Sequence, residues 1–192
     1  MIKDKITSEL KARFAREIQK TVRTGNEHGF LICVDPKGKL YPTKSTCEGK
    51  ECLHMKSLIP ECSHKVQGNF HTHPDVGETI GLLKKDGIKV SFKEARDIYL
   101  KSVKATGNEP RGPSHGDLLA TLSSKYDNID LGTTCIASDA IPNEAECWSI
   151  KNKITKEDYE RAEKESDSPL VNDDPHDWIK PLFIREVIDL KR

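Results

Sequence analysis

Two short motifs bring together residue types that bind catalytic metal ions: His71-Thr72-His73-Pro74 and Pro113-Ser114-His115-Gly116-Asp117. If the first motif lies on a β-strand, its side chains alternate between the two faces of the sheet, so His71 and His73 point the same way. Two imidazoles and a carboxylate suit catalytic zinc, which keeps its fourth position open for water. These residue types therefore predict a zinc site formed by His71, His73 and Asp117.

Each motif alone also has a simpler explanation. Ser-x-x-Asp is a common way for a helix to begin, with Ser114 as the N-cap and Asp117 three residues later. A lone His-x-His pair is weak evidence for a metal. The two motifs occur together here, each with a flanking proline, and this combination favours the metal site over either simpler explanation.

Glu27 is a third candidate, because it directly precedes the apolar segment 30–34. It could be an exposed turn glutamate. In a zinc site it would instead act as a general base, since zinc lowers the pKa of its water to about 7 and a nearby carboxylate can accept the proton.

Together these residues resemble the JAMM (MPN-plus, JAB domain) zinc metalloprotease family, whose pattern is a glutamate, then His-x-His-Pro, then Pro-Ser-x-x-Asp. The resemblance covers roughly residues 4–152 in order. It implies that His71, His73 and Asp117 bind Zn²⁺. It also implies that Glu27 passes a proton from the attacking water to the leaving amine, and that Ser114 hydrogen-bonds the oxyanion.

The same resemblance implies a fold, an activity and a partner. The implied fold is an α/β layered domain with a mixed central sheet flanked by helices, related to the cytidine-deaminase architecture. The implied activity is that of a deubiquitinase-like isopeptidase, which hydrolyses peptide or isopeptide bonds. The expected substrate is a protein or peptide, such as a ubiquitin-like protein conjugate.

The chain departs from the family in the distance between its two metal motifs, which implies an insertion at about 75–112. Asp75, Glu78 and Asp97 are carboxylates closer to the histidines in sequence. We favour Asp117 because it alone follows a proline-serine pair and precedes an apolar helix. Long insertions next to active sites are tolerated at modest entropic cost. We expect residues 75–112 to form a helical lid or exosite.

A second metal site is suggested by a Cys/His-containing loop at about 43–64. Cys47, Cys52, Cys62 and His64 could bind a structural zinc ion, although their spacing is not that of a standard zinc knuckle. The alternative is a loop with free thiols or one incidental disulfide. The other three cysteines fall on predicted strands, where we expect small core residues: Cys33, Cys135 and Cys147.

Three other functions deserve comparison. A non-catalytic MPN-type scaffold is possible, but scaffolds have usually lost ligands. A metal-dependent phosphoesterase generally needs several more histidines, and only His115 and His176 remain downstream. A zinc deaminase needs His-x-Glu and Pro-Cys-x-x-Cys, which do not occur here. We expect His28 and His115 to be exposed neighbours of site residues.

Composition sets the broad class. The 192 residues suit a single domain, 1–192, with a substantial core. Lysine plus arginine equals aspartate plus glutamate at 31 each, which argues against a nucleic-acid-binding surface. No apolar run approaches a membrane span, and the N-terminus lacks the apolar core of a signal peptide. We therefore expect a cytoplasmic protein with reduced cysteines.

The site residues must be positioned by elements that the hydrophobic pattern also predicts. Predicted helices cover 4–23, a segment from a capping box at Ser91 to about Gly107, a segment starting at Ser114, and 155–165. Predicted strands cover 30–34, 39–42, 66–73, 133–137 and 146–150. Residues 43–64 read as irregular, 167–177 as an acidic loop, and 183–190 as either strand or helix.

Overall fold

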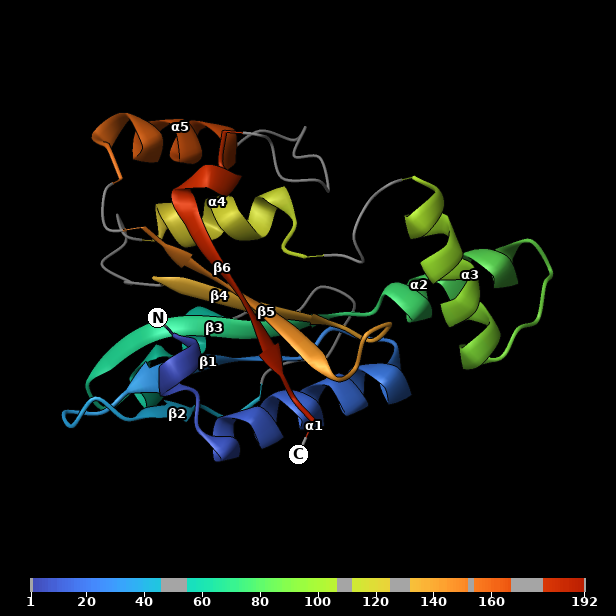
Figure 1. The fold of residues 1–192 in the computed structure, drawn as a ribbon, viewed down its shortest axis with the longest axis horizontal. Helices are drawn as coiled ribbons and strands as arrows, with labels where there is room; N and C mark the ends of the chain where they lie inside the picture. Colours follow the sequence, from blue (N-terminus) through green and yellow to red (C-terminus); the bar gives the residue numbers. More distant parts are fainter. Residues whose placement is uncertain are drawn as a thin grey trace.

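A computed structural model describes residues 2–45, 55–106, 112–124, 132–151, 154–166 and 178–191. Its centre is a mixed sheet of six strands in the order β2-β1-β3-β4-β5-β6 (Figure 1). Only β3 and β4 run parallel, and the other neighbouring pairs are antiparallel. The strands are β1 (Gly29–Val34), β2 (Leu40–Pro42), β3 (Lys65–His73), β4 (Thr133–Ser138), β5 (Glu144–Ile150) and β6 (Phe183–Asp189).

One face of the sheet is covered by helix α1 (Ser8–Thr24), which the short helix η1 (Lys3–Lys5) precedes (Figure 1). The apolar residues of α1 recur every four positions, so they form one face that packs on the sheet. Phe14 of α1 stacks on Phe70 of β3 with ring centroids 4.2 Å apart. This contact belongs to the largest buried apolar cluster, which holds α1 against β1, β3 and β4.

The opposite face is covered by helix α4 (His115–Ser123), with α5 (Lys156–Ser166) beyond it (Figure 1). Leu118, Leu119 and Leu122 of α4 pack against Ala162 of α5 and against Phe183, which follows η3 (Lys180–Leu182). The sheet is therefore the middle layer of the molecule. Buried apolar surface on both faces fixes its position.

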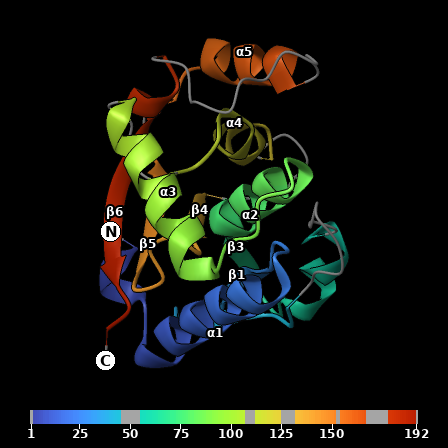
Figure 2. The same cartoon turned by 90° about the vertical axis from the view of Figure 1, so that its right-hand side faces the viewer.

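Two helices, α2 (Asp75–Lys85) and α3 (Phe92–Ala105), form a hairpin that leaves the sheet at the end of β3. The hairpin projects to one side of the body (Figure 1), and Figure 2 views it from that side. Its inner residues share a small apolar cluster with Ala140 and Ile141 of the β4–β5 turn. Arg96 of α3 also donates a hydrogen bond of 2.7 Å to the carbonyl of Ala140.

The structure confirms the expected α/β class with a mixed sheet flanked by helices. It also confirms the capping box at Ser91, where Ser91 and Glu94 bond each other's backbone amides. Residues 183–190, for which the sequence pattern allows strand or helix, contain the edge strand β6. Helix α2 was not predicted, and residues 55–61 of the segment expected to be irregular form the short helix η2 (Met55–Glu61).

The expectation of reduced cysteines is wrong for four residues, of which three were expected in the core and Cys62 in the loop at 43–64. Cys33 on β1 pairs with Cys62, and Cys135 on β4 pairs with Cys147 on the neighbouring strand β5. Cys135 and Cys147 are also direct partners in the strand register, so their sulfurs meet across the ladder. Cys33, Cys135 and Cys147 are buried, as expected, but as halves of disulfides.

Among the described residues, no helix has the length and apolar character needed to cross a membrane.

Candidate metal centre

The two histidines of the first motif lie at the end of β3 and point to the face of the sheet that α4 covers. Strand alternation puts Phe70 and Thr72 on the opposite face, toward α1. His71 and His73 are both buried. Because β3 is flanked by β1 and β4, its backbone is hydrogen-bonded on both sides and holds the two imidazoles in place.

Asp117 reaches the same place from the first turn of α4. Ser114 is the N-cap of this helix, and its hydroxyl accepts a hydrogen bond from the Asp117 amide at 3.2 Å. In return, Asp117 Oδ2 accepts from the Ser114 amide at 2.8 Å and from the Ser114 hydroxyl at 2.7 Å. The capping box that begins α4 therefore also fixes the direction of the Asp117 carboxylate, the predicted metal ligand.

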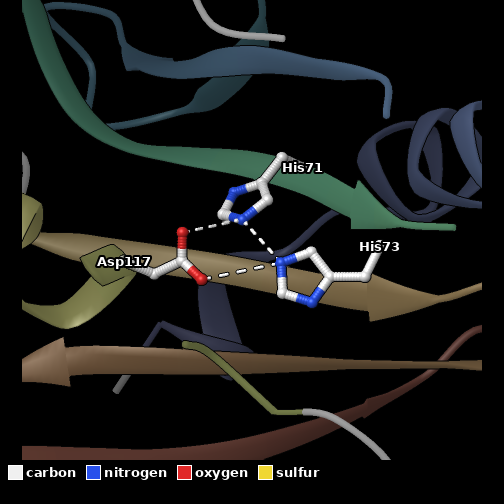
Figure 3. Close-up of side chains that lie close together, drawn as sticks. All are labelled: His71, His73 and Asp117. Carbon is white, nitrogen blue, oxygen red and sulfur yellow. Dashed lines mark hydrogen bonds and ion pairs between the residues drawn. The ribbon is translucent and has the colours of Figure 1, made fainter. Parts of the chain in front are cut away.

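The two imidazoles and the carboxylate converge at one point (Figure 3). Nε2 of His71 lies 3.1 Å from Asp117 Oδ1, and Nε2 of His73 lies 3.5 Å from Asp117 Oδ2. The two Nε2 atoms are 3.2 Å apart. These three residues form the one His/Cys/Asp/Glu group with metal-binding geometry in the described parts of the chain.

These separations fit a small tetrahedral cation. Zinc bonds of about 2.0–2.1 Å place neighbouring tetrahedral ligands about 3.3 Å apart. Around His71, Nδ1 lies 3.4 Å from Asn69 Oδ1, which also accepts a 2.9 Å hydrogen bond from the Thr134 hydroxyl. A protonated Nδ1 donating to this amide oxygen leaves the lone pair of Nε2 free for a metal. His73 Nδ1 is buried and has no hydrogen-bond partner in the described structure.

Charge in the cluster is balanced between the carboxylate and the imidazoles. Burial raises the pKa of the Asp117 carboxyl, but His71 and His73 lower it more, so that pKa lies well below its usual range. Burial lowers the pKa of His73, but Asp117, Asp75 and Glu27 more than offset this and leave it above the ordinary value. The three carboxylates thus favour positive charge at His73, and the two imidazoles favour the ionised form of Asp117.

Glu27 lies in the short segment that joins α1 to β1. Helix α1 ends at Thr24 and is capped by Gly25, whose φ of 66° is the left-handed conformation that favours glycine. Glu27 then follows, half-buried, immediately before His28 and β1. It is close enough to the metal cluster for its charge to act on His73. The general base predicted from the sequence is therefore within electrostatic range of one predicted ligand.

The proposed second zinc site does not form as expected. Cys62 is paired with Cys33 in a disulfide, so its sulfur is unavailable as a thiolate ligand. His64 is exposed. Cys47 and Cys52 lie outside the described residues.

Two further corrections concern the histidines next to site residues. His28 is buried, with its imidazole 2.9 Å from the Thr24 hydroxyl, and burial lowers its pKa. His115 is completely buried, and its Nε2 lies 3.0 Å from Glu165 Oε2 of α5. Both side chains therefore support the fold and are not exposed substrate contacts.

Sequence reasoning missed the residues that support the ligands. Asn69 had a detectable signal, because it shares the strand face of His71 by alternation. Asp139 gave no comparable signal. Its backbone amide donates to the His73 carbonyl at 3.1 Å, and its carboxylate accepts from the first amides of α2. The nearer carboxylates that could have replaced Asp117 do not join the cluster, and Asp75 instead bonds the Ser138 hydroxyl.

Comparison with known protein families, with characterised proteins and with solved structures finds no match to this chain.

Proposed function

We propose that this chain is a zinc-dependent peptidase or isopeptidase of the JAMM type, with an MPN/JAB-type fold. The observation that carries the proposal is the meeting of His71, His73 and Asp117 from two distant motifs at tetrahedral ligand spacing. Glu27, whose charge acts on His73, would be the general base that a hydrolase needs.

Each residue has a distinct role in this proposal. His71, His73 and Asp117 would hold zinc, which would supply a water of lowered pKa and a Lewis acid for the scissile carbonyl. Glu27 accepts the proton of the attacking water and delivers it to the leaving amine. The Ser114 hydroxyl accepts a hydrogen bond from the Asp117 amide and donates its single proton to the Asp117 carboxylate. Rotation of the hydroxyl would redirect that proton to an oxyanion while the bond from the amide is kept.

The α2–α3 hairpin is proposed to act as the lid or exosite for a protein substrate. It starts directly after the ligand strand, since α2 begins at Asp75. Three large apolar side chains are exposed on it, namely Leu82, Ile88 and Ile98. Exposed apolar residues beside an active site are typical of a surface that binds another protein. A ubiquitin-like protein conjugate is the substrate class that we propose.

One observation weighs against the phosphoesterase alternative. Such sites need additional histidines around the metals. His115 does not supply one, because its imidazole is paired with Glu165 of α5. The scaffold alternative predicts that the ligand cluster serves no chemistry. Only a measurement of catalytic activity distinguishes such a scaffold from a hydrolase.

A cleavage assay tests the proposal. Linear fusions of ubiquitin-like proteins and a short peptide library are incubated with metal-free protein, with zinc restored, and with excess chelator. We expect cleavage only when zinc is restored. Zinc binding without cleavage of any peptide or isopeptide bond would favour the scaffold, and release of phosphate from phosphoesters would favour the phosphoesterase.

A further inference from the structure

We infer that Thr72, the residue between the two histidine ligands, is a positioning residue that holds the segment carrying Glu27. This inference rests on the proposed function, because it concerns the general base of that reaction. Thr72 touches no substrate in this scheme. Its side chain lies on the opposite face of β3 from His71 and His73, and it acts through the backbone of His28.

The contacts of Thr72 are reciprocal and buried. Its amide donates to the His28 carbonyl at 3.0 Å, and its hydroxyl oxygen accepts from the His28 amide at 2.9 Å. The same hydroxyl lies 3.2 Å from the His28 carbonyl and 2.5 Å from the Thr21 hydroxyl on α1. Thr72 and Thr21 are both completely buried. Water therefore does not replace these partners.

The hydrogen count fixes the direction of each bond. A hydroxyl has one proton and can accept two hydrogen bonds. The His28 amide can only donate and the His28 carbonyl can only accept. Thr72 Oγ1 therefore donates to that carbonyl, and it accepts from the His28 amide and from the Thr21 hydroxyl. All three capacities of the Thr72 hydroxyl are used: two link β3 to His28, next to Glu27, and the third links β3 to Thr21 on α1.

Helix α1 fixes the other end of the segment that carries Glu27. The carbonyl of Thr21 accepts the Gly25 amide at 2.8 Å, which closes the last turn of α1. Residues 25–28 are thus held by Thr21 at one end and by Thr72 at the other. Glu27 lies between the two attachments, so its direction relative to His73 depends on both.

The buried hydroxyl at position 72 needs a structural reason, because a buried hydroxyl is costly in free energy. The neighbouring residues on this face of the sheet are apolar, including Phe70 and Ile32. Burying a hydroxyl there is unfavourable unless it is hydrogen-bonded. Valine would fill the same volume and keep the β-branched shape that strands favour. What Thr72 adds over valine is the connection to His28.

Thr43 provides a matched control, because it repeats this pattern on Leu31 inside β1 and not on the residue that follows Glu27. Its amide donates to the Leu31 carbonyl at 3.0 Å, and its hydroxyl accepts from the Leu31 amide at 3.0 Å. Thr43 is also buried. Thr43→Val and Thr72→Val therefore remove the same kind of hydrogen bond from the same kind of backbone pair. Only the second removes it beside Glu27.

The test compares Thr72→Val, Thr72→Ser and Thr43→Val in the zinc-loaded full chain. We expect Thr72→Val to bind zinc as wild type does, with KM unchanged and kcat lowered about 10- to 100-fold, the usual result of displacing a catalytic group by about 1 Å. Thr72→Ser, which keeps the hydroxyl, restores kcat. Thr43→Val loses a similar amount of stability but keeps kcat.

A crystal structure of each zinc-loaded variant gives a readout that does not depend on hydrolysis. We expect the Glu27 carboxylate to keep its distance to zinc in Thr72→Ser and Thr43→Val, and to move away in Thr72→Val. An unmoved Glu27 in Thr72→Val, or an equal loss of kcat in Thr43→Val, overturns the inference. If the wild-type chain binds zinc but cleaves nothing, the proposed function fails, and the Glu27 position still decides the role of Thr72.

Discussion

The carboxylate of Asp117 lies 3.1 Å from Nε2 of His71, although the whole α2–α3 hairpin separates the two residues along the chain. The hairpin leaves the body at Pro74, and the chain returns at Ser114 to begin α4 over the same face of the sheet. The hairpin thus starts and ends beside the cluster of His71, His73 and Asp117 without disturbing its geometry. It also places new surface next to the site, where a substrate would approach.

The ligand assignment predicts a clear pattern of zinc content. His71→Ala and Asp117→Asn each remove one of three protein ligands, so both variants should lose most of the zinc that the wild-type chain retains at about one equivalent. Metal analysis of dialysed protein by mass spectrometry measures this. Asp75→Asn is the control, because Asp75 is a buried carboxylate near His73 that lies outside the ligand cluster. Zinc lost from Asp75→Asn and kept by Asp117→Asn would reverse the assignment.

The hairpin should select protein substrates without taking part in the chemistry. Leu82, Ile88 and Ile98 are 62%, 49% and 43% exposed, so replacing all three by serine should not disturb the core. We expect KM for a protein conjugate to rise several-fold while kcat and the cleavage of a short peptide stay unchanged. Steady-state kinetics on both substrates measure this.

The matched control for the hairpin lies on the edge strand β6. Ile184 and Val187 are each 41% exposed, similar to Ile98, but they lie on the last strand of the sheet and not on the hairpin. Their replacement by serine should leave KM for the protein conjugate unchanged. If the hairpin and β6 variants behave alike, the hairpin is not the exosite.

Asp139 predicts a pH dependence of stability in the metal-free protein. Burial, opposed by hydrogen bonds from Val76 and Gly77 and assisted by the nearby acids, raises its pKa from 3.8 to about 6. Since the folded pKa is the higher one, this group contributes most stability below pH 4, and that contribution is lost as pH rises through 6. Asp139→Asn does not titrate and so lacks this loss. Between pH 4 and 8, the free energy of unfolding of the variant should therefore rise by on the order of 2 kcal/mol relative to that of the wild type.

Urea unfolding of both proteins at several pH values, with chelator present, measures this difference. The amide introduced by Asp139→Asn still offers one oxygen to the first turn of α2, so the pH dependence of the difference is more informative than its absolute value. A difference between the two proteins that stays constant from pH 4 to 8 would show that Asp139 titrates normally in the folded state.

The cysteine pairing predicts a definite peptide map. Digestion without reductant should yield linked peptides containing Cys33 with Cys62 and Cys135 with Cys147. The first bridge ties β1 to the chain that follows η2, and the second ties β4 to β5, so reduction should lower the melting temperature. Alkylation of Cys62 in the native protein, together with a second equivalent of zinc, would instead support the structural zinc site.

Most of the helices and strands could be predicted, because the sequence patterns that specify them lie within each element. The four-residue spacing in α1, the alternation in β3 and the capping box at Ser114 are all read from neighbouring residues. The common face of His71 and His73 could also be predicted, since the two histidines of His-x-His on a strand must share a face. These predictions depended only on geometry within one element.

What the sequence could not supply depends on contacts between distant elements. Helix α2 starts without an N-cap side chain of its own, and Asp139 from the β4–β5 turn bonds its first amides instead. His115 is next to a site residue in sequence, but the packing of α5 on α4 buries it against Glu165. Cys62 has no spacing that identifies Cys33 as its partner. The capping of α2, the burial of His115 and the pairing of Cys62 all depend on the tertiary fold, which a single sequence does not reveal.

The most direct test of the central claim is the activity of Glu27→Gln with its zinc content measured on the same sample. Glutamine keeps the size and polarity of Glu27 but cannot accept a proton, and Glu27 is not among the metal ligands. We predict that the variant retains zinc at the wild-type level and loses zinc-dependent peptide or isopeptide cleavage by about 100-fold or more. Cleavage at the wild-type rate by zinc-loaded Glu27→Gln would contradict this account of the site.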